Sequence, residues 1–548
     1  MGIKILAIHD GHNASAAVFD GRRLVSAISE ERLNREKFYW GFPTLSIAQA
    51  LSDAGMEMDD IEAIAVSHLG AGAYARRKLS ALSTYDPRFF LGHLYNVFVS
   101  FARERTIRKL AGRREVYFCD HHRAHAASAY YFGESDEALV VTIDALGDQL
   151  SHTAYEVKND VWKPLAYGGA SASLGAFYAS VTEGLGFRAN RHEGKVVGLA
   201  ALGDPDGAKE YISDLVTLDT DGLSFRRAPY MSMKGAVERA LRNGVSRESI
   251  AACAQNKLEE LVIAHVRALL KKTDVRYLVC AGGVFANVKL NQRLLEECGV
   301  EDFFIQPAMG DEGLVLGAAL AYLSARGETG LVAPLDSLYL GNAASESDVR
   351  RAAQAAGLAV EELNDPARDT AHLVTTGRIV GWFDGRMEFG PRALGHRSIL
   401  ADPRTRGINE ILNTRLHRSD FMPFAPSVLA ERATEIFDVR GAKLAAEFMT
   451  ITMNVRPAWR ERVPAIVHAD HTARPQLVER GRNPHYYDVI QAFAEHTGIP
   501  LVLNTSFNIH EEPIVSSAED ALRSLRVGAV DCIVFNNKYL VRGEKSRA

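Results

Sequence analysis

The chain contains few cysteines, and none of them is spaced like a metal or disulfide pair. There are five in 548 residues, an odd number with no CxxC pattern: Cys119, Cys253, Cys280, Cys298 and Cys532. This scatter excludes a disulfide framework and a zinc ribbon. It is typical of proteins from a reducing compartment, and we expect a cytoplasmic location.

Long hydrophobic runs are also missing. The first ten residues, MGIKILAIHD, form an apolar strand that turns polar too soon for a signal peptide. No run approaches the roughly 20 apolar residues of a membrane helix. Leu6 breaks the myristoylation pattern. We therefore expect no membrane partner.

There is no excess of positive charge. Lysine and arginine number 63 against 68 aspartate and glutamate, a net charge of -5. Nucleic acid and anionic membranes normally require a basic surface, so neither is expected as the main partner. Hydrophobic residues at 47% and charged residues at 24% indicate a globular protein. The length exceeds what one core usually supports and predicts two domains.

Strand patterns occur twice with the same plan. Apolar strands are predicted over 3–8, 14–19 and 24–29, with a hairpin at Asp20-Gly21. Residues 139–144 and 152–157 repeat an apolar strand that ends in an acid, a turn with glycine and a second strand. This repeat favours a duplicated nucleotide-binding architecture, although any antiparallel protein contains similar hairpins. A helix followed by a strand over 379–383 begins a new pattern, and we place a domain boundary near 345.

The sequence His121-His122-Arg123-Ala124-His125 has the spacing of a two-point metal clamp. A helix through it places His121 and His125 on one face, one turn apart. Apolar flanks favour a buried helix, where paired imidazoles need a partner, over a solvated helix face. Asp311, just before a predicted helix over 314–323, is the candidate third ligand, with a plain N-cap as the alternative. Two histidines and one carboxylate leave open positions that suit iron(II) or a similar divalent ion as a Lewis acid.

Two glycine-bearing loops are candidate phosphate sites. Gly282 and Gly283 follow a strand over 276–279 and let the backbone approach a nucleotide, unless they only form a tight turn. Neither a Walker loop nor a GxGxxG fingerprint is convincing. The second loop, 385–398, belongs with further arginines and a polar strand end at 504–508. Several converging guanidinium groups would hold a small polyanion and a triphosphate, although each arginine alone is typical of a surface ion pair.

In this order, the motifs resemble the NodU/TobZ-type O-carbamoyltransferases nearly from end to end. The matching pieces are HDGHNASA (9–16), EER (30–32), HHRAH (121–125), EGKV (193–196), GGVFAN (282–287), GDEG (310–313), GPRALG (390–395), MPFAP (422–426), TARPQ (472–476) and NTSFN (504–508). The resemblance implies an α/β protein with two domains. A duplicated ASKHA (actin-like ATPase, Kae1-like) domain would span 1–345 and a YrdC-like α/β domain would span 346–548.

The resemblance also implies a two-site reaction. The second domain would make carbamoyl-adenylate from carbamoyl phosphate and ATP, with Mg²⁺. The first domain would transfer the carbamoyl group to a hydroxyl of a small natural product or sugar.

Each matching motif implies a role for its residues. His121, His125 and Asp311 would bind the metal, and His12, oriented by Asp10, would be the general base. The adenylate ligands would be Asp144, Lys195, Gly282, Gly283 and Asn287. The carbamoyl phosphate ligands would be His417, Arg418, Arg474 and Ser506, and the ATP ligands Arg386, Arg392 and Asn504.

Two positions depart from the family pattern, and two other functions compete. Ala145 stands where the family commonly has glycine, and His417 stands where lysine is frequent. The competing functions are threonylcarbamoyl transfer to tRNA and a non-catalytic ASKHA nucleotide-binding module. Similar proteins serve aminoglycoside, macrolide, ansamycin and lipo-chitooligosaccharide acceptors. Residues 74–114, where we favour amphipathic helices over a basic docking surface, are the candidate variable acceptor region.

Overall fold

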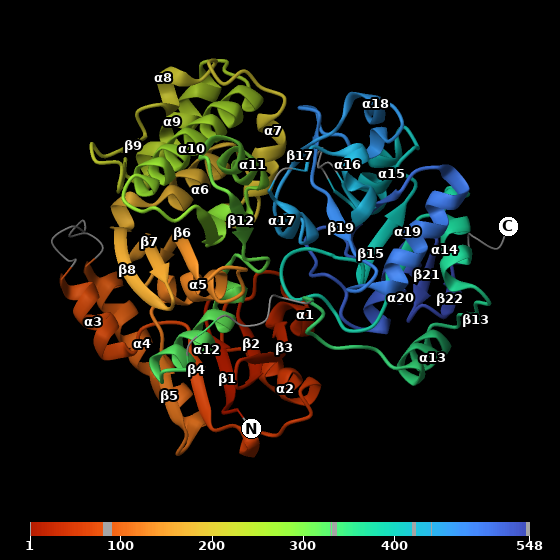
Figure 1. Cartoon of the computed structure of the whole chain (residues 1–548), viewed down its shortest axis with the longest axis horizontal. Coiled ribbons are helices and arrows are strands. Elements are labelled where there is room, and N and C mark those ends of the chain that lie inside the picture. Colours follow the sequence, from red (N-terminus) through yellow and green to blue (C-terminus); the bar gives the residue numbers. More distant parts are fainter. Residues whose placement is uncertain are drawn as a thin grey trace.

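Two five-stranded sheets built to one plan form the N-terminal part of the chain (Figure 1). The computed structural model describes residues 2–80, 90–328, 330, 337–418, 424–439 and 441–543. In each sheet the first three strands are antiparallel neighbours, and the first strand also pairs in parallel with the fourth, which pairs in parallel with the fifth. The first sheet contains β1 (Lys4–His9), β2 (Ser15–Asp20), β3 (Arg23–Ser29), β4 (Ala63–Val66) and β5 (Glu115–Phe118). The second contains β6 (Glu137–Gly147), β7 (Leu150–Lys158), β8 (Val161–Gly169), β11 (Tyr277–Ala281) and β12 (Asp302–Ile305).

The central strands β1 and β6 are largely apolar, as expected where both faces of a sheet are covered. Residues 5–9 of β1 are buried, as are residues 138–143 of β6. The hairpins expected near Asp20-Gly21 and between 144 and 152 are present in register. The duplicated ASKHA arrangement expected from the repeat is confirmed by the identical strand orders.

Two helices pack against each other between the sheets, and their N-terminal ends lie close together. α5 (His121–Tyr130) follows β5, and α12 (Leu314–Ala325) follows β12 through a short 3₁₀ turn, η6 (Asp311–Gly313). A Cβ added at Gly317 would lie 1.7 Å from the carbonyl oxygen of Ala124, so only glycine allows this close approach. The first turns of both helices consequently present their side chains to one space.

Other helices cover the outer faces and edges of the two sheets. Around the first sheet lie α1 (Glu30–Asn34), α2 (Thr44–Asp53), α3 (Ala71–Ser80) and α4 (Phe90–Ala111). Around the second lie α6 (Leu174–Gly184), α7 (Glu193–Ala200), α8 (Lys209–Ile212), α9 (Tyr230–Arg242), α10 (Arg247–Leu270) and α11 (Val288–Glu297), with the small hairpin of β9 (Val216–Leu218) and β10 (Phe225–Arg227). Helices α3 and α4 occupy most of the candidate acceptor region, of which residues 81–89 lie outside the described part.

The C-terminal part is an α/β unit around one mixed eight-stranded sheet, drawn in cyan to blue in Figure 1. Its strand order is β13-β22-β21-β14-β15-β20-β16-β19, and all eight strands follow residue 359. The predicted boundary at 345 falls immediately before α13 (Glu346–Ala355). The strands are β13 (Val360–Glu362), β14 (Val380–Phe383), β15 (Arg397–Ala401), β16 (Ala425–Leu429), β19 (Gln476–Val478), β20 (Leu501–Ser506), β21 (Cys532–Phe535) and β22 (Tyr539–Arg542).

Short and long helices complete this part. They are α14 (Pro366–Thr375), α15 (Ile408–Arg415), α16 (Ala433–Ile436), α17 (Lys443–Glu447), α18 (Pro457–Arg460), α19 (Pro484–Thr497) and α20 (Ala518–Arg526), beside a two-stranded ribbon of β17 (Met453–Asn454) and β18 (Thr472–Ala473). The first two residues of the MPFAP motif, Met422 and Pro423, lie outside the described residues.

Arginines from both parts fasten them together through backbone carbonyls. Arg32 donates to Gly390 O at 2.9 Å, and Arg35 donates to Pro513 O at 2.8 Å and Ile514 O at 2.7 Å. In the other direction, Arg386 donates to Gly341 O at 3.0 Å, to Val25 O at 3.2 Å and to Leu340 O. Hydrogen bonds from charged donors are strong, so these contacts stabilise the interface between the two parts. We call this interface, formed around Arg32, Arg35 and Arg386, the joint.

Of the helices in the described ranges, none has the length and apolar character that a membrane span requires.

Candidate active site

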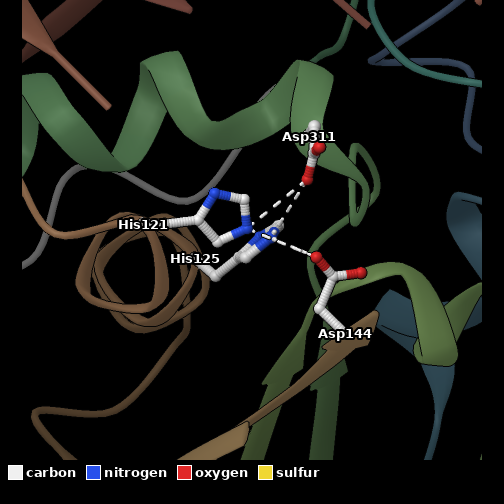
Figure 2. Close-up of side chains that lie close together, drawn as sticks. All are labelled: His121, His125, Asp144 and Asp311. Carbon is white, nitrogen blue, oxygen red and sulfur yellow. Dashed lines mark hydrogen bonds and ion pairs between the residues drawn. The ribbon is translucent and has the colours of Figure 1, made fainter. Parts of the chain in front are cut away.

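Four side chains from separate elements converge where α5 and α12 begin. His121 and His125 come from the first turns of α5, Asp311 from η6 and Asp144 from β6, and Figure 2 shows them pointing toward one another. Their potential ligand atoms all lie within 4.8 Å of each other. Local chemistry explains the helix start, because Asp120 caps α5 by accepting from Arg123 N at 3.0 Å. The structure thus brings together the three predicted metal ligands and adds Asp144.

The distances within this cluster suit an intervening cation better than direct hydrogen bonds. Asp311 Oδ1 lies 3.6 Å from Nε2 of both His121 and His125, and Asp144 Oδ2 lies 3.3 and 3.8 Å from the same two atoms. His125 is fully buried, and neither of its ring nitrogens has a hydrogen-bond partner among the described residues. Buried polar atoms are rarely left without partners. Two imidazoles and two carboxylates therefore fit a divalent metal such as iron(II), and Asp144 is a candidate fourth ligand.

The carboxylates also change how the imidazoles titrate. Burial opposes protonation of His121, but Asp311 and Asp144 outweigh it and raise its pKa to about 9. Burial similarly opposes protonation of His125, and the two aspartates again raise its pKa. His122 is directed away and its Nδ1 lies 2.8 Å from Thr142 Oγ1. Burial, with the neighbouring charges of His121 and His125, lowers the pKa of His122 to about 3.

Two glycines make this convergence possible. A Cβ at Gly147 would lie 2.0 Å from the ring of His121, and one at Gly282 would lie 2.3 Å from Ile143 O. Gly282 also has φ of 104°, a backbone conformation that favours glycine. The backbone N–H of Gly283 donates to Asp144 Oδ1 at 3.1 Å, so the predicted nucleotide loop touches the cluster directly.

His12 lies beside the cluster, but its carboxylate neighbour differs from the one expected. His12 Nδ1 is 3.9 Å from Asp311 Oδ2, whereas the other oxygen of Asp311, Oδ1, lies 3.6 Å from Nε2 of His121 and of His125. Asp10 is instead held by Arg103 through bonds of 2.6 and 2.9 Å and lies 3.0 Å from His68 Nε2. The expectation that Asp10 orients the His12 ring is therefore corrected, because a bidentate arginine already occupies that carboxylate.

Three predicted arginines of the C-terminal part form a second cluster. Arg474 lies among the charges of Arg392 and Arg418, and burial together with those charges lowers its pKa well below the usual value. Burial also lowers the pKa of Arg392 and of Arg418 to about 10. Nε of Arg392 and of Arg474 is buried without a hydrogen-bond partner in the described part of the chain. Three neighbouring guanidinium groups, two of them with a buried Nε that has no partner, form a candidate anion site.

Polar groups from β20 border this arginine cluster. Arg418 donates to Thr505 Oγ1 at 3.2 Å and to Ser506 Oγ at 3.4 Å. Ser506 is therefore placed with Arg418 as predicted. His417 has a left-handed backbone with φ of 55° and lies exposed at the end of α15.

Sequence reasoning did not select Glu312, which follows Asp311 in η6. Asp311 Oδ1 lies 3.6 Å from both imidazoles, whereas Glu312 Oε2 accepts from Asn13 Nδ2 at 3.4 Å. Burial and the charge of Asp311 raise the pKa of Glu312 to about 7. Arg392 donates to Ala286 O at 3.4 Å, in the turn that follows Gly283. The arginine cluster thus adjoins the glycine loop of the metal cluster across the joint.

Several predicted ligands have other partners. Asn287 exchanges hydrogen bonds of 2.8 and 3.1 Å with Gln255 and caps α11 through Leu290 N, so its side chain is occupied. Arg386 belongs to the joint described above, away from the three clustered arginines, because three carbonyls take its guanidinium donors.

The last two predicted ligands lie at the borders of the site. Asn504 is buried in the sheet and donates to Ala393 O at 3.2 Å and Ser427 Oγ at 2.9 Å, which places it below the 390–395 loop. Lys195 lies on α7 with Nζ 5.6 Å from the ring centre of Phe187, close enough to His510 to influence its charge across the joint.

Comparison with known families agrees with this two-part site. The family model described as "Carbamoyltransferase N-terminus" matches residues 1–320, and "Carbamoyltransferase C-terminus" matches residues 371–542. The chain belongs to the carbamoyltransferase family.

Relatives along most of the chain include nodulation proteins. Nodulation protein NolNO of Sinorhizobium fredii is 33% identical over 98% of this chain and 79% of its own length. Nodulation protein NolO of Bradyrhizobium diazoefficiens is 37% identical over 77% of this chain and 78% of its own. Nodulation protein U of Azorhizobium caulinodans is 27% identical over 91% of this chain and 92% of its own.

Similarity to solved structures is weaker. Component A of the Acidaminococcus fermentans (R)-2-hydroxyglutaryl-CoA dehydratase has a TM-score of 0.38 and 17% identity, and it covers 59% of this chain and 100% of its own. Full-length HypF in its phosphate- and nucleotide-bound form has a TM-score of 0.33 and 12% identity, and it covers 59% of this chain and 46% of its own.

Proposed function

We propose that this carbamoyltransferase uses ATP and carbamoyl phosphate to make carbamoyl-adenylate and then carbamoylates a hydroxyl of a small molecule. The observation that carries the proposal is the pairing of two chemically different clusters across one joint. One offers imidazole and carboxylate ligands, and the other offers crowded guanidinium groups. Arg392 links the two clusters by donating to Ala286 O at 3.4 Å, in the turn that follows Gly283.

The arginine cluster suits the first half-reaction. Carbamoyl phosphate and ATP are both polyanions, and Arg392 and Arg474 each have a buried Nε without a partner that could donate to them. Arg418 would add its positive charge. Ser506 would add a hydroxyl to the phosphate contacts. Water would first hydrolyse carbamoyl phosphate to carbamate and phosphate. The carbamate would then attack the α-phosphate of ATP, which gives carbamoyl-adenylate and releases pyrophosphate.

The histidine cluster suits the second half-reaction. A divalent ion bound by His121, His125, Asp311 and Asp144 would act as a Lewis acid that stabilises negative charge on the carbonyl and leaving group. His12, whose Nδ1 lies 3.9 Å from Asp311 Oδ2, would remove the proton of the attacking hydroxyl. Gly283, which has no side chain, would let the adenylate approach the backbone beside Asp144. We propose that AMP leaves once the carbamoyl group has moved.

The competing function on tRNA has less support. A tRNA-modifying enzyme must bind a long polyanion, whereas this chain has a net charge of -5 and its most crowded arginines are largely buried at the joint. The nodulation-protein relatives favour a small-molecule acceptor. A non-catalytic nucleotide switch would have no use for a buried four-residue metal site.

The test is the formation of AMP and carbamoylated product from defined components. Purified protein is incubated with ATP, Mg²⁺, iron(II), carbamoyl phosphate and a panel of hydroxylated natural products, and both products are followed by mass spectrometry. We expect AMP only when carbamoyl phosphate is present, and loss of AMP formation in Arg474→Ala. Arg432→Ala is the matched control, because Arg432 is half-exposed and pairs with Glu435 at 2.8 Å. AMP formation without carbamoyl phosphate, or carbamoylation of tRNA in preference to the panel, would contradict the proposal.

A further inference from the structure

An exposed tryptophan stands beside the candidate base. Trp40 is 74% exposed, although burying its large ring would be favourable. Its ring centre lies 5.9 Å from that of His12, with the ring planes inclined at 66°. Trp40 and His12 also form a β-bridge, so the backbone fixes their relative position. An exposed aromatic ring held against a catalytic histidine is a ready surface for a substrate.

The segment that carries Trp40 is fixed and strained. Gly41 N donates to Gly11 O at 3.2 Å, and Ala14 N donates to Tyr39 O at 3.3 Å. Phe38 has φ of 59°, which a bulky aromatic residue rarely adopts. Glu31 Oε2 holds this conformation by accepting from Phe38 N at 2.6 Å. Such strain persists where the surrounding structure enforces it, commonly at ligand sites.

Two positively charged side chains lie near the aromatic ring of Phe38. Phe38 lies parallel to His12 with ring centres 6.0 Å apart. Arg191 Cζ and Lys37 Nζ lie 5.5 and 5.6 Å from the centre of the Phe38 ring. The acid of this segment, Glu31, is already paired with Arg32 at 3.0 Å. A molecule extending from Trp40 over Phe38 would therefore meet cations.

We infer that Trp40 stacks on a sugar ring of the acceptor, and that Arg191 and Lys37 select uncharged or anionic glycosides against polycationic ones. A sugar ring has a face of C–H groups that packs on an indole and a rim of hydroxyls that can reach His12. The charges of Lys37 and of the exposed Arg191 would repel an aminoglycoside but not a neutral or acidic sugar. This inference rests on the proposed function for the chemistry, but the stacking surface can be tested without that chemistry.

Isothermal titration calorimetry of the full chain with cellotetraose and with kanamycin tests the inference, without ATP or carbamoyl phosphate. We expect cellotetraose to bind and kanamycin not to bind. Trp40→Ala should weaken cellotetraose binding by about tenfold or more, and Trp40→Phe should restore most of it. Arg191→Glu should allow kanamycin to bind. Tyr167→Ala is the matched control, since Tyr167 is a 73% exposed aromatic on β8, the outer strand of the second sheet.

Melting temperatures close to that of the parent would show that the variants are folded. No binding of cellotetraose to the parent, equal binding to parent and Trp40→Ala, or preferential binding of kanamycin to the parent would each overturn the inference. If cellotetraose binds as expected but no AMP forms with carbamoyl phosphate, the proposed function fails and the sugar site stands.

Discussion

The two histidines of the candidate metal site, His121 and His125, differ in their hydrogen-bond partners. His121 has a carboxylate oxygen at 3.3 Å, whereas His125 is fully buried with no hydrogen-bond partner in the described ranges. The nearest carboxylate oxygens to His125 Nε2, from Asp311 and Asp144, lie at 3.6 and 3.8 Å, beyond hydrogen-bonding distance. A bound metal would supply the direct contact that this buried ring lacks.

His125→Ala should lose bound iron and carbamoyl transfer while AMP formation with carbamoyl phosphate continues in the arginine cluster. Metal content by plasma mass spectrometry and product yield measure the two effects, and we expect metal affinity to fall by about a hundredfold. His265→Asn is the control, because His265 is equally buried but lies under the second sheet and not in the cluster. A His125→Ala protein that keeps its iron and full transfer activity would rule out this site.

Among the elements, β7 and α10 are joined by a buried histidine pair. His152 of β7 and His265 of α10 have ring centres 5.5 Å apart, and each places a ring nitrogen near a carbonyl of the 222–223 turn, at 3.3 and 2.8 Å. Burial lowers the pKa of His265 to about 4 and that of His152 to about 3. Both rings are consequently neutral in the folded protein at neutral pH.

This pair should make the second sheet sensitive to acid. Because the folded pKa of His265 lies below the unfolded value of 6.5, its contribution is complete above pH 6.5 and is lost as the pH falls toward about 4. The loss for His265 alone is about 3 kcal/mol at pH 4. Urea unfolding of the parent and of His265→Gln between pH 7 and about 4 measures it. Equal pH slopes for the two proteins would show that His265 does not titrate in this way.

Local patterns in the sequence predicted the helices and strands well, but they predicted the hydrogen-bond partners of the site residues less well. The strands at 3–8 and 24–29 and the helix through His121 follow from alternation, turn residues and helical spacing, all of which act over a few residues. The partner of Asp10 is Arg103, 93 positions away on a helix whose packing no local pattern reports. Asn287 likewise meets Gln255 from α10. His121, His125 and Asp311 could be selected as candidate metal ligands because of their residue types and helical spacing, whereas Asp144 was selected only as an adenylate ligand and not as a member of this cluster.

At the scale of the whole molecule, two arginines that look alike in sequence, Arg386 and Arg392, have different partners at the joint. Arg386 and Arg392 are six residues apart in one loop and were both ATP candidates. Arg386 donates to three backbone carbonyls, whereas Arg392 makes one long bond to Ala286 O. The first belongs to the joint and the second to the anion cluster.

Arg386→Ala should destabilise the protein by about 2 kcal/mol or more, with the KM for ATP near that of the parent. Arg392→Ala should have the reverse effect, a raised KM for ATP and a small change in melting temperature. Calorimetric melting and steady-state kinetics of both variants decide the matter. A raised KM in Arg386→Ala with unchanged stability would return Arg386 to the ATP site.

The adjoining clusters also predict that the activated carbamoyl group stays within one molecule. Arg474→Ala lacks the first half-reaction and His12→Asn lacks the second, so a mixture holds one intact site of each kind. We expect the mixture to yield much less product than the parent enzyme does at half the total protein concentration. The reason is that an adenylate released to water must reach a second protein molecule before it hydrolyses. Product yield at several protein concentrations is the measurement, and full recovery in the mixture would exclude internal transfer.

Gly317 sets how closely α12 approaches α5, because a Cβ at this position would lie 1.7 Å from Ala124 O. Asp311 precedes α12 in η6, and His121 is the first residue of α5. Any larger side chain at position 317 would therefore push apart the two segments that carry the proposed metal ligands.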